Sequence, residues 1–470
     1  MNQFHFKIFL MIILLAATVH PQSVLSIRVD LNDSGRVIPD DFAGLSFEME
    51  KLLPGKGGKY FFDKNNKALI QLFKTFGIKS LRVGGSTADR PSVPVPNFKD
   101  IDNFFGFVKA AGVKVIYTLR LREGNSENAA AIVKYINERY SKMVDCYAVG
   151  NEPNVFAKEY PVFKKEFEKY TSLIKKYSPK VKFCGPSITP GKAEWVNLFA
   201  EDFGKSGLIK YLTQHAYPGG GGNKVKDPAD ARRAMLSKEW TKLYEKFYGN
   251  IAPALKSSGI KYRIEEANNF YNGGAANVSN TFAASLWGLD FLYQWAQLNS
   301  AGINFHTGDS VAAGEKTNPC YYASFVTSKN GYEVRPLGYA IRAFDLSSKG
   351  KLMPVKILSA ENNLNVNVYA VLSGSNELFV TVINKEFGVD SKIAEVNLNL
   401  DQVIKSAECI SLVNKEHDIA ALQEITLGGA QINSRGIWNG NWEKILIKNP
   451  DKDITIKVPA SSATVLKLSF

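Results

Sequence analysis

The stretch Cys146-Tyr-Ala-Val-Gly-Asn-Glu-Pro-Asn154 decides the fold of this chain. Its first part, Cys146–Val149, is a short apolar run typical of a buried parallel strand, and polar residues follow it directly. Pro153 fixes a turn that would present Asn151 and Glu152 just beyond the strand. The stretch therefore predicts one strand of a parallel sheet, with Glu152 at its carboxyl end.

Similar short apolar runs recur on both sides of this stretch and alternate with amphipathic helices. The candidate strands are Gly44–Glu48, Ser80–Val83, Val113–Leu119, Cys146–Val149, Lys182–Cys184, Tyr211–Ala216, Tyr262–Glu265 and Ile303–His306. In the first intervening helix, Leu69, Leu72, Phe73 and Phe76 follow the spacing of one helical face. Eight strand–helix units predict an α/β fold, a closed (β/α)8 TIM barrel over residues 41–348, with functional residues on the loops after the strands.

The pattern changes to period two after about residue 348. Leu364, Val366 and Val368 alternate with polar residues, and similar alternation continues to the chain end. Residues 349–470 are therefore predicted to form a C-terminal antiparallel β-sandwich domain. The segment 27–40 begins with an extended run, Ile27–Leu31, which we expect to add a strand to that sandwich.

The first 26 residues have the layout of a secretory signal peptide. Lys7 precedes the apolar run Ile8–Ala17, which is too short to span a membrane, and small and polar residues follow up to Ser26. No later apolar run reaches spanning length, so we expect a secreted or periplasmic protein without an integral membrane segment after signal removal. Cys146 and Cys184 fall in consecutive predicted strands; we favour buried thiols, and a disulfide stays open.

Composition and charge narrow the possible partners. The chain has 470 residues and a formal net charge of +13, with lysines scattered rather than gathered in one block. A basic exterior would concentrate an acidic polysaccharide, whereas no nucleic-acid-binding motif accompanies the charge. No Cys/His cluster has metal-ligand spacing, so we predict neither a metal nor another cofactor.

Two glutamates indicate the chemistry. Glu152 follows the fourth strand, and Glu265 and Glu266 end the seventh, so the carboxyls would face each other across the barrel mouth. One carboxyl can protonate a glycosidic oxygen while the other attacks the anomeric carbon, with retention if they lie about 5–5.5 Å apart. Side-chain alternation turns either Glu265 or Glu266 into the helix layer. We expect Arg82 to hold the inward carboxylate ionised, or to form a structural ion pair, and Asn151 to bind the sugar 2-hydroxyl.

Three motifs carry a resemblance to a known family. The runs Leu81–Asp89, Gly150–Asn154 and Glu266–Ala275, with His215-Ala-Tyr217 at the sixth strand, resemble glycoside hydrolase family 79 of clan A. That family contains heparanase and microbial β-glucuronidases. The resemblance covers about Ile27 to the C-terminus and implies a retaining β-glycosidase, a β-glucuronidase acting on uronic-acid-containing glycans.

The resemblance also implies roles for individual residues. Glu266 becomes the nucleophile and Glu152 the acid/base. Asp89 would contact sugar hydroxyls, and Tyr217 would hydrogen-bond the nucleophile. Asn272, Gly273 and Tyr339 would hold the glucuronate carboxylate. Asn272 stands where the family usually has glycine.

Other interpretations stay open from the sequence. An alternative interpretation of Asn272-Gly-Gly274 is a simple turn. The same barrel fits a neutral-sugar β-glucosidase or β-xylosidase, or a non-catalytic carbohydrate-binding protein. His215 is expected to shape the site or donate hydrogen bonds, and His306 to line the pocket or serve structure. Pro218–Gly222 is expected to form a mobile loop over the cleft.

Overall fold

The computed structural model describes residues 22–32, 35–313, 316–361, 364–447 and 452–470. The expected signal segment thus lies mostly outside the described residues. The first described strand already begins at Gln22, four residues before the predicted end of the signal at Ser26. Among the described residues, no helix is long and apolar enough to cross a membrane.

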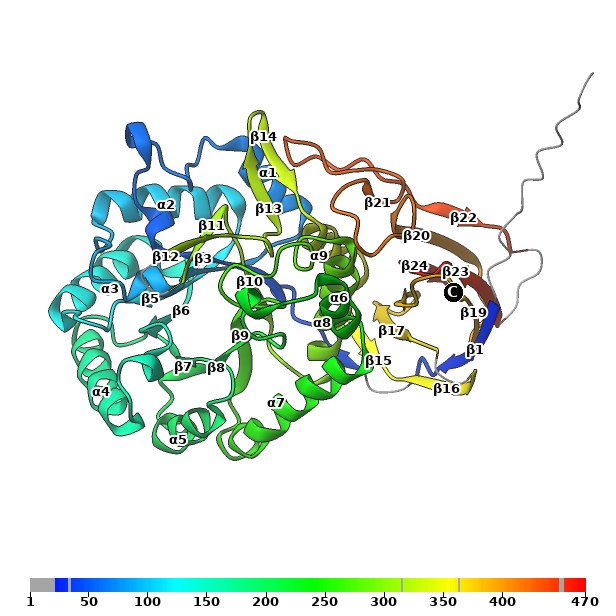
Figure 1. Cartoon of the computed structure of the whole chain (residues 1–470). Helices are drawn as coiled ribbons and strands as arrows, with labels where there is room; N and C mark the ends of the chain where they lie inside the picture. The colour runs from blue at the N-terminus through cyan, green and yellow to red at the C-terminus, as the bar shows by residue number, and fades with distance from the viewer. Residues whose placement is uncertain (1–21, 33–34, 314–315, 362–363, 448–451) are drawn as a thin grey trace, which may run out of the picture.

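Eight parallel strands close into a barrel, which confirms the predicted fold class (Figure 1). They run in the order β10, β3, β4, β5, β6, β7, β8, β9 around the ring. Their bounds are β3 Ala43–Glu48, β4 Ser80–Gly84, β5 Lys114–Leu119, β6 Val144–Val149, β7 Phe183–Ile188, β8 Ile209–Ala216, β9 Lys261–Ala267 and β10 Ile303–His306.

Helices follow the strands and cover the outside of the barrel (Figure 1). They are α1 Lys67–Thr75, α2 Phe98–Ala111, α3 Ser126–Tyr140, α4 Tyr160–Tyr177, α5 Ala193–Phe203, α6 Pro228–Met235, α7 Lys238–Ser258, α8 Phe282–Gln297 and α9 Pro336–Ser347. Local signals set their ends: Asn97 and Asp100 form a capping box at the start of α2, and Gly112 ends it in the left-handed conformation. Two hairpins, β11 Ser310–Ala313 with β12 Lys316–Pro319 and β13 Phe325–Ser328 with β14 Gly331–Val334, separate β10 from α9.

The second domain consists of two sheets. One has the order β16 (Val355–Ala360), β1 (Gln22–Val29), β19 (Ile393–Leu400) and β23 (Asp453–Val458). The N-terminal strand β1 therefore lies inside this sheet, antiparallel to β16 and parallel to β19. The larger sheet contains β2 Arg36–Val37, β15 Lys351–Met353, β17 Val366–Ser373, β18 Glu377–Asn384, β24 Ser462–Ser469, β20 Ser406–Asn414, β21 Ile425–Leu427 and β22 Glu443–Ile445.

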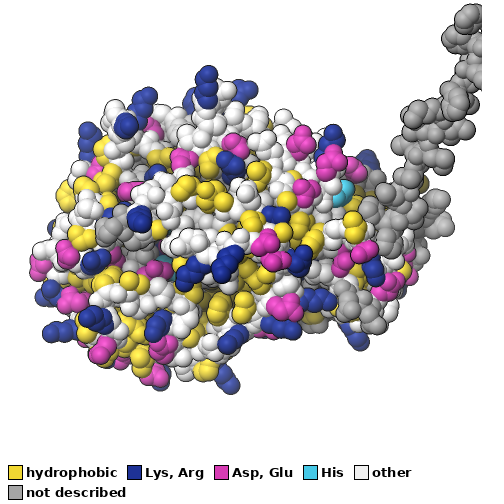
Figure 2. Space-filling view, viewed as in Figure 1, with side chains coloured by type: hydrophobic (Ala, Val, Ile, Leu, Met, Phe, Trp, Pro, Cys, Tyr) yellow, Lys and Arg dark blue, Asp and Glu magenta, His cyan; other side chains and the backbone are white. Residues whose placement is uncertain are grey.

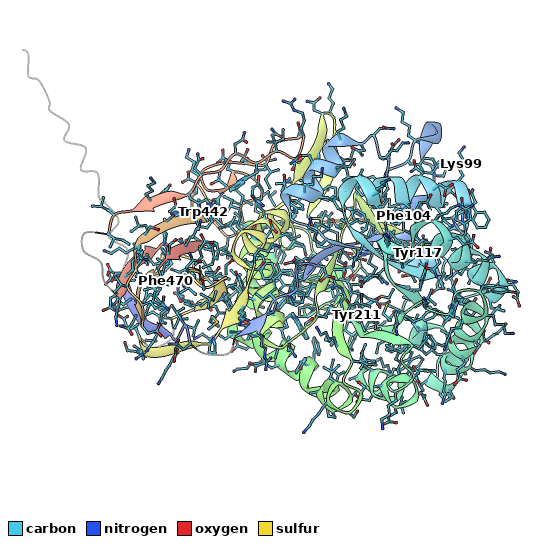
Figure 3. All side chains as sticks on the ribbon, turned by 180° about the vertical axis from the view of Figure 1, so that it is seen from behind. Lys99, Phe104, Tyr117, Tyr211, Trp442 and Phe470 are labelled. Carbon is cyan, nitrogen blue, oxygen red and sulfur yellow. The ribbon has the colours of Figure 1, made fainter. Side chains whose placement is uncertain are left out.

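The larger sheet is apolar on both faces because it packs on both sides. On β17, Ala370 joins the core between the two sheets, whereas Tyr369 and Val371 join the barrel core. The barrel side is covered by α8, whose residues are buried nearly all round, and the Tyr293 ring stacks on Tyr369 with centroids 4.6 Å apart. Seen from behind, the side chains fill both domains, with Phe104 and Tyr117 in the barrel and Trp442 in the sandwich (Figure 3). The two domains are therefore joined by a continuous packed layer.

Lysine and arginine side chains are scattered over the surface. Figure 2 shows them interspersed with aspartate and glutamate on the visible face, without one dense basic block. Basic side chains are thus dispersed on this face of the molecule.

Candidate active site

A cleft of about 470 Å³ lies at the carboxyl ends of the barrel strands. Both candidate carboxylates line it, together with other polar and aromatic side chains from the strand ends and from the loops that follow the strands. Its lining includes Glu48, Glu152, Tyr217, Glu266, Tyr271, Asn272, His306 and Tyr322. In (β/α)8 barrel enzymes the active site lies in a polar, ligand-sized cavity at this end of the barrel.

Glu152 reaches the cleft through an unusual backbone. The strand β6 ends at Val149, Gly150 follows with a φ of 83°, and Glu152 itself has a φ of 50° in the left-handed region. This conformation is costly for a residue with a Cβ and is held by the Glu152 N–H, which donates to the carbonyl of Ser187 at 2.8 Å. The half-buried carboxylate accepts from or donates to His215 Nδ1 at 2.9 Å.

Glu266 is the most heavily supported carboxylate of the cleft. Its Oε2 lies 2.5 Å from Arg82 Nη1, and its Oε1 accepts a hydrogen bond of 2.9 Å from the hydroxyl of Tyr217. His215 Nδ1 is 3.6 Å from Oε1, and His306 Nδ1 is 3.8 Å from Oε2. Burial by itself raises the pKa of Glu266, but His215, His306 and Arg82 outweigh it and hold that pKa far below its ordinary value.

A bulge in β9 places two neighbouring glutamates on the same side of the barrel wall. Ile264 pairs with Ile303 and Ala267 with Phe305, so both Glu265 and Glu266 lie opposite Asn304. The expectation that one of them points into the helix layer is therefore wrong. Glu265 is fully buried, 3.7 Å from Arg82 Nε and within 3.6 Å of Cys184 Sγ, deeper in the barrel than Glu266.

A chain of hydrogen bonds beneath the two carboxylates links Arg82, Asn151 and Asp89. Arg82 Nη2 donates to Asn151 Oδ1 at 2.7 Å, which leaves the Asn151 amide nitrogen for other partners. Asp89 does not line the main cleft: its Oδ2 accepts from the Asn151 N–H, and its Oδ1 accepts from the N–H groups of Leu121 and Arg122. Burial raises the pKa of Asp89 in spite of these bonds. Asp89 thus fixes the loop that carries Asn151, in a side pocket beside Glu152.

His306 links Glu266 to a second acidic group. Its Nδ1 is 3.1 Å from Ser46 Oγ, and its Nε2 is 3.5 Å from Oε1 of Glu48, which ends β3. Glu48 also accepts hydrogen bonds from Thr87 and from the Ala312 N–H. Burial lowers the pKa of His306, but Glu266 and Glu48 together raise it above its ordinary value. Glu48 was missed by the sequence reasoning because a polar end to the first strand carries no motif.

The turn after β9 walls the far side of the cleft. Asn272, Gly273 and Gly274 have φ values of 60°, 90° and 87°, and Asn272 lines the cleft. Among the described residues the N–H groups of these three donate no hydrogen bond, while the Gly273 carbonyl accepts from the Tyr321 N–H at 2.6 Å. The turn is tied to the glycine-rich loop after β8 by backbone bonds between Tyr271, Gly220 and Gly222.

Tyr339 does not belong to the cleft, which corrects its assignment as a substrate-binding residue. It lies on α9 facing the second domain, where its hydroxyl accepts from the Ile432 N–H at 3.2 Å. The tyrosine that lines the cleft before α9 is Tyr322, on the loop after β12. Its ring lies 6.3 Å from that of Tyr217, and burial raises its pKa well above the ordinary value. The paired Tyr321-Tyr322 ahead of the helix was the available signal in the sequence.

Three ligand-type groups converge at the centre of the site. One atom each of Glu152, His215 and Glu266 lie within 4.8 Å of one another, so a carboxylate oxygen of each glutamate is within that distance. These are the residues that would hold a cation if one bound. Arg82 already supplies a positive charge to Glu266.

Comparisons with known proteins agree with this geometry. The model of the glycosyl hydrolase family 79 N-terminal domain matches residues 104–293, a span that contains Glu152 and Glu266. A β-glucuronidase from Aspergillus niger is 42% identical over 52 residues, which is 11% of this chain and about a tenth of that protein's length.

Solved structures show the fold over nearly the whole chain. A 4-O-α-L-rhamnosyl-β-D-glucuronidase from Fusarium oxysporum 12S superposes with a TM-score of 0.71 at 16% identity, covering 94% of this chain and 100% of that one. A family 51 arabinofuranosidase from Xanthomonas axonopodis pv. citri superposes with a TM-score of 0.71 at 13% identity. The superposition covers 95% of this chain and 100% of that one. The match of residues 104–293 to a glycosyl hydrolase family 79 domain confirms the resemblance that the motifs predicted, in a chain built on a (β/α)8 barrel.

Proposed function

We propose that the protein is a retaining β-glucuronidase that acts on uronic-acid-containing glycans by double displacement. One observation carries the proposal: an oxygen of Glu152 and an oxygen of Glu266 lie within 4.8 Å of each other across the cleft. This spacing suits a nucleophile and an acid about 5–5.5 Å apart, and it leaves no room for the water that an inverting pair must accommodate.

The surroundings assign different roles to the two carboxylates. Arg82, His215 and His306 keep Glu266 ionised, as a nucleophile must be, and Tyr217 orients it. Glu152 is half-buried and contacts His215, whereas the ion pair with Arg82 goes to Glu266. A carboxyl that lines the open cleft can reach the glycosidic oxygen, as a general acid must.

Glycosyl transfer to the enzyme is the first step. Glu152 gives its proton to the glycosidic oxygen while Glu266 attacks the anomeric carbon, the bond to the leaving oxygen breaks, and an alcohol departs. A glycosyl ester on Glu266 remains. Asn151, oriented by Arg82, would donate to the sugar 2-hydroxyl as positive charge develops at the anomeric carbon.

Hydrolysis of the ester completes the cycle. Glu152, now a carboxylate, takes a proton from water, whose oxygen attacks the anomeric carbon and releases Glu266. Two inversions return the β configuration, and Glu152 is again protonated.

Preference for glucuronate is supported by the far wall of the cleft. The unengaged N–H groups of the turn 272–274 can bind a carboxylate without a competing full charge, and Tyr271 and Tyr322 add hydroxyls nearby. Tyr322 thus takes the place that the resemblance gave to Tyr339 beside the glucuronate carboxylate.

A panel of 4-nitrophenyl glycosides tests the reaction and the sugar together. We expect hydrolysis of the β-glucuronide, with kcat/KM at least about a hundredfold above the β-glucoside and β-xyloside, because those sugars leave the amide turn unpaired. Proton NMR of the first product should show the β anomer before mutarotation. Faster hydrolysis of a β-glucoside or β-xyloside would contradict the preference for glucuronate. An α anomer as first product would contradict retention. Inertness toward the whole panel would indicate a carbohydrate-binding protein.

Location outside the cytoplasm is part of the same proposal. The apolar segment near the N-terminus supports it, and a signal that leaves β1 whole would end before Gln22. Cell fractionation with N-terminal sequencing of the mature protein is the test. An intact Met1 on a cytoplasmic protein would contradict it.

A further inference from the structure

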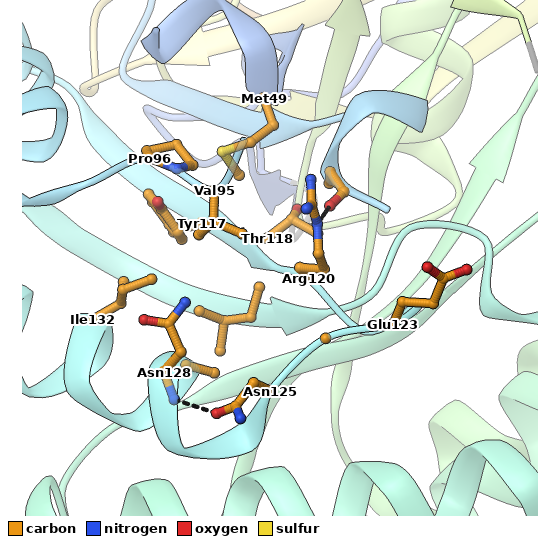
Figure 4. Close-up of a pocket in the computed structure, with 14 residues that line it drawn as sticks. Met49, Val95, Pro96, Tyr117, Thr118, Arg120, Glu123, Asn125, Asn128 and Ile132 are labelled. Carbon is orange, nitrogen blue, oxygen red and sulfur yellow. Dashed lines mark hydrogen bonds between the residues drawn. The ribbon is translucent and has the colours of Figure 1, made fainter. Parts of the chain in front are cut away.

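A cavity of about 180 Å³ lies between β5, the start of α3 and the loop that joins β4 to α2 (Figure 4). None of its lining residues also lines the catalytic cleft or the side pocket beside Glu152. Exposed residues around the start of α3, Gly124, Asn125 and Asn128, form its mouth. This cavity, here called the β5–α3 pocket, is therefore separate from the residues proposed to act on the sugar.

The interior of the β5–α3 pocket is mostly apolar. Met49, Leu119, Ala129 and Ile132 line it, and each of them is more than nine-tenths buried. An engineered cavity of about 150 Å³ with apolar walls binds benzene, so the volume of this pocket suits a ring of similar size. The walls therefore favour a ligand with an apolar body.

One polar group in this interior has no partner. Tyr117 of β5 is only 2% exposed, and its hydroxyl forms no hydrogen bond within the described part of the chain. Burial, with a smaller contribution from Asp100, raises the pKa of Tyr117, so the hydroxyl keeps its proton and can donate it. A buried donor without an acceptor is unfavourable, and an oxygen of a bound molecule would satisfy it. Asn128 extends from α3 into the pocket and offers a second polar contact at the mouth (Figure 4).

The two charged residues that line the pocket are engaged or face away from it. Arg120 donates through Nε to the Ala88 carbonyl at 2.8 Å, and through Nη2 to the carbonyls of Arg90 and Val93 at 3.0 and 2.6 Å. The carboxylate of Glu123 is directed away from the pocket at its edge (Figure 4). A bound ion would therefore lose its hydration without gaining a counter-charge, which favours a neutral ligand.

We propose that the β5–α3 pocket binds a neutral small molecule that has an apolar ring and one hydroxyl or carbonyl oxygen. The oxygen accepts the hydrogen bond of Tyr117, and the ring packs on Met49, Ala129 and Ile132. The size, the apolar walls, the unpartnered donor and the absence of a facing charge among the lining residues all agree with this class of ligand.

The pocket also adjoins the loop that supports the catalytic cleft. Ala88 lines the pocket, and the next residue, Asp89, accepts the N–H of Asn151 through Oδ2. Arg120 holds the same loop through its bonds to three carbonyls. A molecule in the pocket would therefore restrict opening of residues 86–96, which hydrogen exchange measures.

Four probes of nearly equal size test the ligand class. Saturation-transfer NMR titrations of the whole protein compare benzyl alcohol, toluene, benzoate and benzylamine. We expect benzyl alcohol to bind with a Kd on the order of 1 mM, which about eight non-hydrogen atoms allow. Toluene lacks the acceptor and should bind up to about tenfold more weakly, and the two ions more weakly still. Tighter binding of any of these three, or no binding of benzyl alcohol at about twentyfold the expected Kd, overturns the proposal.

Variants assign the binding to this pocket. Tyr117→Phe deletes only the unpartnered hydroxyl, so benzyl alcohol should lose up to about tenfold in affinity while toluene keeps its own. Ala129→Leu fills the cavity and should abolish binding of both. The matched control is Tyr147→Phe, because the Tyr147 hydroxyl is also buried without a partner among the described residues but does not line the pocket. Affinity for benzyl alcohol that is unchanged in Tyr117→Phe overturns the proposal.

Hydrogen exchange locates the bound molecule. Saturating benzyl alcohol should slow amide exchange in residues 86–96 and 119–132, and should leave residues 215–222 and 270–274 around the catalytic cleft unchanged. Protection confined to the cleft segments would overturn the proposal. No step of this experiment uses turnover, so its outcome does not depend on the proposed glucuronidase activity.

Discussion

Glu266 and Glu152 have the same chemistry and different surroundings. Burial favours the neutral form of Glu266, yet His215, His306 and Arg82 lower its pKa far below the ordinary value. Glu152 faces His215 and the open cleft. In the proposed mechanism, environment rather than residue type therefore separates the nucleophile from the acid, and a single sequence reveals this difference only through a family resemblance.

The acid/base role proposed for Glu152 predicts a dependence on the leaving group. In Glu152→Gln no proton is available, so kcat/KM on natural glycans should fall by about a thousandfold, while aryl glucuronides with acidic phenols should lose far less. Steady-state kinetics across phenols of graded pKa measures this. An equal loss on good and poor leaving groups would argue against the acid role, and Glu138→Gln on the exposed face of α3 serves as the control.

His306 predicts how stability changes with pH. Because its pKa is raised in the folded protein, its stabilising effect is complete below the unfolded value of about 6.5 and is lost as pH rises through the folded value. Glu266 behaves in the opposite way. Its contribution to stability is present above about pH 4.3, the ordinary pKa of a glutamate, and is lost only as pH falls toward its lowered pKa.

Denaturant unfolding of the wild type and of His306→Gln measures this dependence. The difference in free energy of unfolding between the two proteins should be largest near pH 6 and should shrink toward pH 9. A difference that grows over this range would mean that His306 is neutral in the folded protein.

Among the elements, the strands were the easiest to predict and the site loops the hardest. Ile303–His306 was predicted with its observed bounds, and the other seven strands were found within a few residues. The bulge that turns Glu265 and Glu266 to one side could not be predicted, because it depends on pairing with β10. The glycine-rich loop after β8 was expected to be mobile, yet Gly219 and Gly222 donate backbone bonds that dock it on the turn after β9.

That docked turn predicts a specific sensitivity. A Cβ on Gly273, at a φ of 90°, would meet the Pro319 carbonyl oxygen at 2.3 Å, so Gly273→Ala must displace the turn. We expect kcat/KM on 4-nitrophenyl β-glucuronide to fall at least about tenfold, and stability to fall by about 1–3 kcal/mol. Gly259→Ala is the control: at a φ of 68° it has the same unfavourable backbone conformation for alanine, but an added Cβ meets no neighbouring atom. Equal kinetic effects in both variants would contradict a role for the turn.

Tyr339 and Tyr322 show where motif transfer failed. The resemblance assigned Tyr339, on the last barrel helix, to the substrate carboxylate. In the structure the Tyr339 hydroxyl contacts Ile432, and Tyr322 on the loop before the helix lines the cleft. Helical periodicity alone could not decide this, since both faces of α9 are buried.

The whole molecule depends on how the sandwich packs on the barrel. At this interface Lys385 Nζ lies 2.9 Å from Asp290 Oδ2, with side chains only 2% and 8% exposed, and Tyr369 donates to the same carboxylate. The sequence predicted two domains, but not which polar groups meet between them. Residues 290 and 385 lie 95 positions apart, and only the fold brings them together.

This buried pair predicts a strong coupling between the domains. Lys385→Met leaves Asp290 without its cation and should lower the free energy of unfolding by about 3–5 kcal/mol. The double variant Asp290→Asn with Lys385→Met should recover part of that loss. Lys134→Met, from an exposed pair on α3, should change stability by less than about 1 kcal/mol. Similar small effects at both pairs, in denaturant titrations, would show that the interface tolerates an unpaired charge.

A covalent label on the nucleophile tests the central claim most directly. A 2-deoxy-2-fluoro-β-glucuronyl fluoride slows release of the glycosyl ester, so peptide mapping by mass spectrometry should find the sugar on Glu266. Glu266→Gln should lose both labelling and, by roughly a thousandfold or more, turnover. A label on another residue such as Glu265, or turnover of glucuronides by an enzyme that never becomes labelled, would contradict the account.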